Sequence, residues 1–139
     1  MNINRNAAAF VELVQELILE KGYVLLNRRE YEKAEHLGDK LLGYFDSKGV
    51  YFIPDRLFVL AADFMSKHKT NVTDIETDLF VSDMIKIEDD GYKIRYRRQK
   101  RIGSTKKRFL TFERKVFEGN RQFAEIIILI SNQPIDKSL

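Results

Sequence analysis

The chain has 139 residues, 44% of them hydrophobic, which suits one domain with a sizeable core. It contains no Cys, which excludes a disulfide framework, a thiolate metal site and a cysteine nucleophile, and no apolar run approaches the length of a membrane span. Its first residues lack the basic and apolar regions of a secretion signal, so we expect a cytoplasmic protein without a membrane partner.

The N-terminal segment predicts one amphipathic helix and a short apolar segment. Apolar residues follow helical spacing over residues 5–21, where Asn4 or Asn6 can cap the start and Gly22 suits the end. The run Tyr23–Leu26 that follows is either a strand or a segment that fills the core. We expect both segments to serve packing.

A charged helix and a small hairpin come next. Asn27 begins a capping box for a second helix, which should end at Gly38. Two aromatic-rich runs within Leu41–Ile53 flank the turn residues 46–49. This pattern predicts a β-hairpin with Gly49 at a position of positive φ.

Two further helices precede the most basic part of the chain. Pro54 ends the second strand of the hairpin, and Asp55 can cap a helix over residues 55–68. A shorter helix is predicted over residues 71–80. The acidic turn of residues 88–91 then leads into the basic stretch.

The distribution of charge is the strongest functional signal. Residues 92–115 contain eleven Lys or Arg and one acid, Glu113, and so carry +10, whereas the whole chain carries only +3. The remainder is mildly acidic, and such an asymmetry points to an anionic partner that is met at one place. Lys and Arg also prevent edge strands from aggregating, but that role explains only a few of these charges.

The basic stretch also predicts a β-hairpin. Its two runs alternate in polarity, and the dipeptide Gly103-Ser104 between them is typical of a turn. The apolar side, expected to face the core, consists of Tyr92, Ile94, Tyr96, Leu110, Phe112 and Val116. The residues expected to contact phosphates are Arg95, Arg97, Arg98, Lys100, Arg101, Lys106, Lys107 and Arg108.

The order of the predicted elements indicates a fold class. The apolar run Phe123–Ser131 predicts a buried strand or one paired with another subunit, and residues 132–139 a flexible tail. Helix, small hairpin, helix, helix and basic hairpin is the order of a winged helix-turn-helix. We therefore expect a single α+β domain of this type over residues 1–131, with the basic β-hairpin as its wing and an added C-terminal strand.

These segments resemble a known family. The runs GYFDSKGVYFIPDRLFVLAADF and DLFVSDMIKIEDD, followed by the basic hairpin, are similar to the C-terminal winged-helix domain of certain helicase–primase proteins. Those proteins belong to a domain-of-unknown-function family of phages and other mobile genetic elements. The similarity covers residues 5–117 and implies an accessory DNA-binding module in replication or regulation. The family's ATPase motor has no counterpart here, because the chain contains no Gly-x-x-x-x-Gly-Lys-Ser/Thr loop.

The helix expected to enter a major groove departs from a simple DNA-binding model. It carries three acids and has no Lys or Arg between residues 71 and 85. Carboxylates repel the phosphate backbone, so the hairpin should supply most of any DNA binding. An alternative is that the helix reads base edges through Asn71, Thr73 and Thr77.

Phe109 is expected on a different face of its predicted strand from the neighbouring aromatic residue Phe112. It shares a face with Thr111 and Glu113, opposite Leu110 and Phe112. It would either stack on an unpaired base beside the neighbouring cations or cover the second side of the sheet.

Functions outside nucleic-acid binding remain open as alternatives. We expect no enzyme activity and no cofactor, and the two histidines, His36 and His68, show no zinc-site spacing. The sharpest enzyme alternative is a metal-dependent nuclease in which Asp55 and Glu113 hold Mg²⁺ and Lys115 activates water. The other is a protein-interaction module, an adaptor or inhibitor, whose cationic hairpin docks on an acidic or nucleic-acid-binding groove of a partner.

Overall fold

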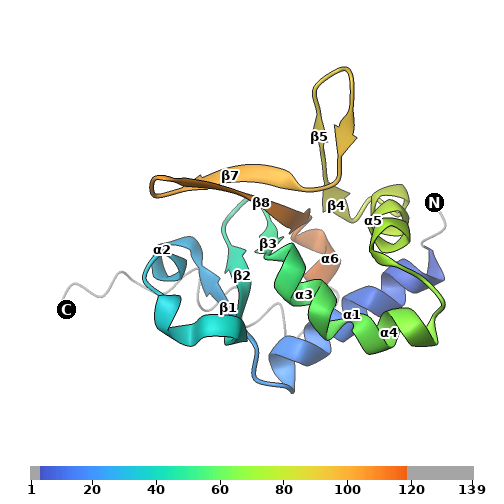
Figure 1. Ribbon diagram of the computed structural model, residues 1–139, viewed down its shortest axis with the longest axis horizontal. Helices are drawn as coiled ribbons and strands as arrows, with labels where there is room; N and C mark the ends of the chain where they lie inside the picture. Colours follow the sequence, from blue (N-terminus) through green and yellow to red (C-terminus); the bar gives the residue numbers. More distant parts are fainter. Residues whose placement is uncertain (1–3, 119–139) are drawn as a thin grey trace.

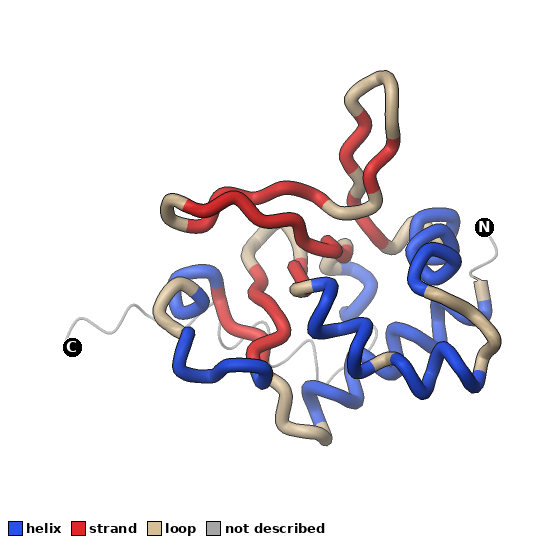
Figure 2. The backbone as a smooth tube through the Cα atoms, viewed as in Figure 1, coloured by secondary structure: helices blue, strands red, loops and turns tan. Residues whose placement is uncertain are grey.

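A curled sheet runs through the middle of the protein (Figures 1 and 2), and the computed structural model describes residues 4–118. The strands of this sheet are β1 (Val24–Asn27), β2 (Leu41–Phe45), β3 (Val50–Phe52), β4 (Ile85–Lys86), β7 (Arg98–Ile102) and β8 (Thr105–Phe112). Their order is β1-β2-β3-β8-β4, and β7 pairs with β8 beyond that path. Only the β1–β2 pair is parallel. The fold is a mixed α+β domain.

The first helix, α1 (Arg5–Leu19), forms as its spacing predicts. Asn4 is the cap, because its side-chain oxygen accepts hydrogen bonds from the N–H groups of Asn6 and Ala7 at 2.8 and 3.3 Å. Beyond the helix, Gly22 has a φ of +80°, which glycine adopts without strain. The apolar run that follows is the strand β1.

The second predicted helix is wrong in length, although its cap is right. Asn27 caps α2 (Arg28–Tyr31) through its side-chain oxygen, and a separate 3₁₀ helix, η1 (Glu35–Lys40), follows. Gly38 inside η1 has a φ of +55° and a ψ of −133°, which no continuous helix accommodates. Tyr31, at the end of α2, packs its ring against Tyr44 and Phe109 of the sheet.

Strands β2 and β3 form the predicted small hairpin. The Asp46 carboxylate holds the turn by accepting a hydrogen bond from the N–H of Gly49 at 3.1 Å. Gly49 does not have the expected positive φ. Space is limited at this position, because a Cβ on Gly49 would lie 3.0 Å from the carbonyl oxygen of Phe112. Within β2, a Cβ on Gly43 would lie 1.8 Å from the carbonyl oxygen of Tyr51, so only glycine fits.

The single helix predicted after this hairpin is broken in two. α3 (Pro54–Leu60) begins at a proline, whose fixed φ suits the first turn, so Asp55 lies inside the helix and does not cap it. Ala61 has a φ of −91° and a ψ of 5°, and α4 (Ala62–Lys67) continues beyond it. The break allows one phenylalanine from each half to contact the ring of Phe10, both at centroid distances of 5.7 Å.

The next helix, α5 (Val72–Val81), matches its prediction. Asn71 caps it by accepting a hydrogen bond from the N–H of Asp74 at 2.9 Å. A short helix, α6 (Lys115–Glu118), ends the described part of the chain. None of the helices within residues 4–118 has the length and apolar character needed to cross a membrane.

Buried side chains form a cluster on each side of the sheet. The larger cluster lies between the sheet and helices α1, α3 and α5. The smaller one, which we call the aromatic cluster, lies beside α2 and consists of Tyr31, Ala34, Leu41, Tyr44, Tyr51 and Phe109. Burial raises the pKa of Tyr51 to about 12, so this hydroxyl stays protonated at neutral pH. The strands β2 and β3 are therefore covered on both faces.

The single basic hairpin predicted for residues 92–115 is wrong, because the chain forms two separate arms (Figure 1). A short arm pairs β5 (Glu88–Asp89) with β6 (Ile94–Arg95), and a long arm pairs β7 with β8. The chain reverses between β5 and β6 because the Asp90 carboxylate accepts hydrogen bonds from the N–H groups of Tyr92 and Lys93, both at 2.9 Å.

The short arm also corrects the predicted core face. Tyr92 is 100% exposed and Ile94 is 47% exposed, so neither belongs to the core. Tyr96 is half-buried, and it packs against Phe80 at a centroid distance of 5.8 Å. The predicted strand Phe123–Ser131 and the predicted tail at 132–139 lie outside the described residues.

Candidate nucleic-acid interface

The long arm is built on one continuous strand. The inner half of β8 (109–112) is at most 1% exposed, and its residues 110–112 pair with β3 or β4. The outer half (105–108) is exposed and pairs only with β7. Gly103, with a φ of +60°, allows the tight turn at the tip. A buried strand thus holds a projecting two-stranded tip, which extends over β2 and α2 in Figure 1.

The register of this arm places cation opposite cation. Lys100 pairs with Lys107, and Arg101 pairs with Lys106. Like charges directly opposite each other on a sheet are destabilising. The pKa of Lys100 is lowered by burial first and then by the positive charge of Arg98. The tip is therefore a site of concentrated positive potential.

The predicted cations divide between the two faces of the arm, since opposite residues of an antiparallel pair share a face. Arg98, Lys100 and Lys107 lie on the inner face together with Phe109, and the Lys100 ammonium lies 5.3 Å from the centroid of the Tyr51 ring. The outer face carries Arg101, Lys106 and Arg108, all of which are exposed. Both faces thus present cations at the tip.

Two predicted phosphate contacts are already engaged within the protein. The Arg97 Nε lies 3.0 Å from a carboxylate oxygen of Glu76, whose side chain is only 8% exposed. The Arg108 guanidinium donates to Glu88 at 3.1 Å and to the carbonyl oxygen of Arg97 at 3.1 Å. The pKa of Glu88 is lowered, chiefly by the hydrogen bond from the N–H of Gln99 and then by Arg108.

The remaining predicted cations stay available to a ligand. Within residues 4–118, the side chains of Arg101, Lys106 and Lys107 make no hydrogen bond or ion pair with other described side chains or backbone groups. Arg95 is also exposed but lies on the short arm, in β6. The structure therefore places six of the eight on the long arm, and five of these are not in an ion pair with the described residues: Arg98, Lys100, Arg101, Lys106 and Lys107.

Cations outside the basic stretch extend this surface, and sequence reasoning missed them. The Arg28 Nη2 donates to the carbonyl oxygen of Arg101 at 2.9 Å and so links α2 to the arm. Arg28 and Lys48 both contribute to lowering the pKa of Lys100, which shows that their charges lie near it. Neither residue carries a sequence signal for this role, because only the fold brings α2 and the β2–β3 turn to the arm.

Helix α5 mainly supports the two arms and contributes less to the surface that could contact a ligand. Glu76 pairs with Arg97, and the Thr77 hydroxyl donates to the carbonyl oxygen of Thr73 at 2.9 Å and lies 3.2 Å from the Tyr96 hydroxyl. The pKa of Asp78 is raised, mainly by burial. These contacts join α5 to the segment between the two arms.

Phe109 does not stack on a base, because its side chain is only 1% exposed. Its ring meets Tyr44 edge-on at a centroid distance of 5.3 Å, and Tyr31 at 6.2 Å. Of the two roles considered from the sequence, the structure shows the second: Phe109 covers the other side of the sheet.

The residues of the nuclease alternative occupy separate elements. Asp55 is exposed in the first turn of α3, whereas Glu113 follows β8 and lies 3.9 Å from the Lys86 ammonium. Lys115 lies 3.2 Å from an Asp83 carboxylate oxygen. Among residues 4–118, no group of three His, Asp or Glu side chains is arranged to hold a metal ion.

The ion pair between Arg97 and Glu76 predicts a measurable effect on stability. Replacing Arg97 by Ala leaves a buried carboxylate without its partner, and we expect a loss of about 1–3 kcal/mol in the free energy of unfolding. Urea denaturation followed by circular dichroism measures this change. Arg95→Ala is the matched control and should stay within about 0.5 kcal/mol of wild type; equal losses in both variants would contradict a specific role for the pair.

Comparisons of the chain with protein-family models, with curated proteins and with solved structures each found no match. Any functional proposal for this protein therefore depends on its own geometry and charge. The contacts of the long arm supply the strongest such basis.

Proposed function

We propose that the protein is a nucleic-acid-binding module, with DNA as its expected target, and that the long arm is its phosphate-binding element. The observation that carries this proposal is the register of the arm, which sets Lys100 opposite Lys107 and Arg101 opposite Lys106. Two repulsive pairs of this kind do not by themselves stabilise the folded chain. A polyanion lying along the arm relieves the repulsion and releases its own counterions.

The charge of the arm exceeds what a structural role requires. Natural edge strands are protected from aggregation by one or a few charged side chains. Glu88 is paired with Arg108 at the inner end of the arm, and among the described residues no acid forms an ion pair with Arg101, Lys106 or Lys107 at the tip. Arg28 and Lys48 add further positive charge from other elements. This convergence supports an anionic partner.

We further propose that the long arm serves as the wing of a winged-helix module. Helices α3, α4 and α5 precede the arm in the order expected of such a fold. The resemblance to the helicase–primase family supports an accessory role in replication or regulation of a phage or mobile element. The acidic side of α5 and the internal pairing of Glu76 favour the arm over the helix as the main contact.

A salt titration tests this function directly. Fluorescence anisotropy with labelled single-stranded and duplex DNA should show binding that weakens steeply as salt rises, because each neutralised phosphate releases counterions. If about three to five phosphates are contacted, the log–log slope on duplex DNA should be roughly −3 to −4.5. Absence of binding to DNA or RNA even at low salt would overturn the proposal and leave the protein-interaction alternative.

A further inference from the structure

Two exposed apolar side chains lie near the end of the short arm. Tyr92 in its turn is 100% exposed, and Ile94 two residues later is 47% exposed. Within residues 4–118 only two other large apolar side chains are exposed, Val59 and Val81, so Tyr92 is the one among the four that has a ring. Apolar residues scattered singly over a surface are ordinary, but this pair lies together on a projecting arm (Figure 1).

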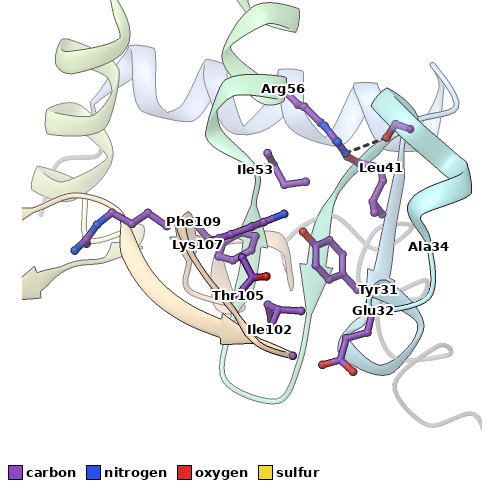
Figure 3. Close-up of a pocket in the computed structure, with 13 residues that line it drawn as sticks. Tyr31, Glu32, Ala34, Leu41, Ile53, Arg56, Ile102, Thr105, Lys107 and Phe109 are labelled. Carbon is purple, nitrogen blue, oxygen red and sulfur yellow. Dashed lines mark hydrogen bonds between the residues drawn. The ribbon is translucent and has the colours of Figure 1, made fainter.

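The cavity beneath the long arm offers no exposed ring to a ligand. Figure 3 shows the rings of Tyr31 and Phe109 in the wall of this cavity of about 470 Å³, but they are only 9% and 1% exposed. The Arg56 guanidinium, which also lines it, is already engaged because it donates to the carbonyl oxygen of Leu41 at 2.8 Å. A ring that stacks on a base must therefore come from another part of the surface.

The turn of the short arm holds the backbone of Tyr92 in place. The Asp90 carboxylate accepts hydrogen bonds from the N–H groups of Tyr92 and Lys93, and the Asp89 carboxylate accepts one from the N–H of Gly91, all at 2.9 Å. Gly91 has a φ of +88°, which glycine adopts without strain. A ring on an ordered turn loses less conformational freedom on binding than a ring on a flexible loop.

Contacts at the base of the short arm fix it to the long arm and to α5. Glu88 in β5 accepts a hydrogen bond from the N–H of Gln99 in β7 at 2.9 Å and pairs with Arg108 in β8 at 3.1 Å. The ring of Tyr96, which follows β6, packs against Phe80 of α5. Figure 1 shows the two arms leaving this junction in different directions. A ligand bound to the long arm therefore meets the short arm in a defined position.

A shallow groove of about 260 Å³ lies where the two arms meet. Its lining includes Lys93, Ile94 and Arg95 of the short arm and Arg108 of the long arm. The side chains of Lys93 and Arg95 make no hydrogen bond or ion pair with the described residues. A strand that leaves the long arm can therefore follow this groove toward Tyr92.

Charge alone does not draw a polyanion to the short arm. Residues 88–95 contain three acids and two cations, a net charge of −1. The acids repel phosphates, and the cations Lys93 and Arg95 offset this repulsion without reversing it. A base carries no net charge, so an unpaired base turned away from its backbone can reach the tip where a phosphate is not favoured. A paired base is stacked inside the duplex and cannot present its face to a ring.

We infer that Tyr92 stacks on an unpaired base of the strand whose phosphates the long arm binds. This inference rests on the proposed function and makes it more specific, since it selects single strands and overhangs over continuous duplex. Stacking on an aromatic side chain contributes about five- to a hundredfold in affinity per base. This contribution should leave the salt slope unchanged, because stacking neutralises no phosphate and releases no counterion.

Two duplexes with overhangs of equal length test the stacking contact by fluorescence anisotropy. One overhang carries adenines and the other is abasic, so the phosphates are the same and only the bases differ. Wild type should bind the adenine overhang at least about fivefold more tightly than the abasic one. In Tyr92→Ala this ratio should fall to about one while the salt slope stays that of wild type.

Two further variants are the controls for this experiment. Tyr92→Phe keeps the ring and removes only the hydroxyl, so the affinity ratio should be retained. Val59→Ala removes an exposed apolar side chain from α3, away from both arms, and should also retain the ratio. Loss of the ratio in Val59→Ala as well as in Tyr92→Ala would contradict a specific contact at Tyr92.

The outcomes separate this inference from the function on which it rests. If wild type binds both probes equally and with steep salt dependence, the stacking inference is overturned and the long-arm proposal stands. If neither probe binds even at low salt, both are overturned. A ratio that survives in Tyr92→Ala would assign the base contact to another residue and overturn the inference. A less steep salt slope in Tyr92→Ala would also contradict it, because the residue would then act on phosphate binding.

Discussion

Replacing Arg101, Lys106 and Lys107 together by Gln should weaken DNA binding by about two orders of magnitude at low salt, at a loss of at least about 1 kcal/mol for each phosphate contact. The three side chains are exposed, so the fold should be retained. The log–log salt slope should become less steep by roughly 2.7, because each lost neutralisation removes about 0.9. All DNA sequences should be affected alike, since phosphate contacts carry no base information.

A second triple variant distinguishes an effect of the arm on DNA binding from an effect of net charge. Lys21, Lys67 and Lys69 are exposed and lie near helix ends away from the arm. Their replacement by Gln removes the same total charge, yet affinity and salt slope should stay close to wild type. Equal weakening by the two triple variants would show that DNA responds to overall charge and would contradict a localised site.

The largest effect on stability is expected for Phe109→Ala. Its ring is 1% exposed and lies within the aromatic cluster, in contact with three tyrosine rings. Removing it leaves a cavity and should cost about 3–5 kcal/mol in the free energy of unfolding. Chemical denaturation measures this loss.

Tyr92→Ala provides the comparison for an aromatic residue outside the core. Tyr92 is fully exposed at the turn of the short arm, so its removal should change the free energy of unfolding by no more than about 0.5 kcal/mol. A loss below about 1 kcal/mol for Phe109→Ala would contradict the buried aromatic cluster described here.

Features set by local chemistry could be predicted from the sequence. Asn4, one of two candidates, and Asn27 each cap a helix, because the cap needs only its own side chain and the next three backbone N–H groups. The small hairpin of β2 and β3 likewise follows from two aromatic runs around a turn. These are contacts between neighbours in the chain.

Features decided by tertiary contacts could not be predicted. The alternation of Tyr92, Ile94 and Tyr96 is typical of a half-buried strand, yet the Asp90 turn directs the first two into solvent. The helix break at Ala61 depends on contacts that phenylalanines of both halves make with Phe10, which lies far away in sequence. Periodicity identifies a face but not whether anything lies against it.

In the candidate site, too, some features could be predicted from the sequence and others depend on tertiary contacts. Composition alone located the cationic stretch, but it could not show that Arg97 and Arg108 are engaged by Glu76 and Glu88, since those acids belong to other elements. Nor could it place Arg28 against the arm. Which cations face a ligand is a property of the fold.

The construction of β8 has a consequence for how this protein can vary among relatives. Its inner half belongs to the buried sheet and its outer half to the exposed tip, so the tip can lengthen or shorten without disturbing the core. Side chains alternate between faces, so insertions are tolerated in steps of two residues in each strand. A single residue inserted in the outer half of β8 would exchange the faces on which Lys106 and Lys107 lie. Divergence in arm length should therefore proceed in multiples of four residues.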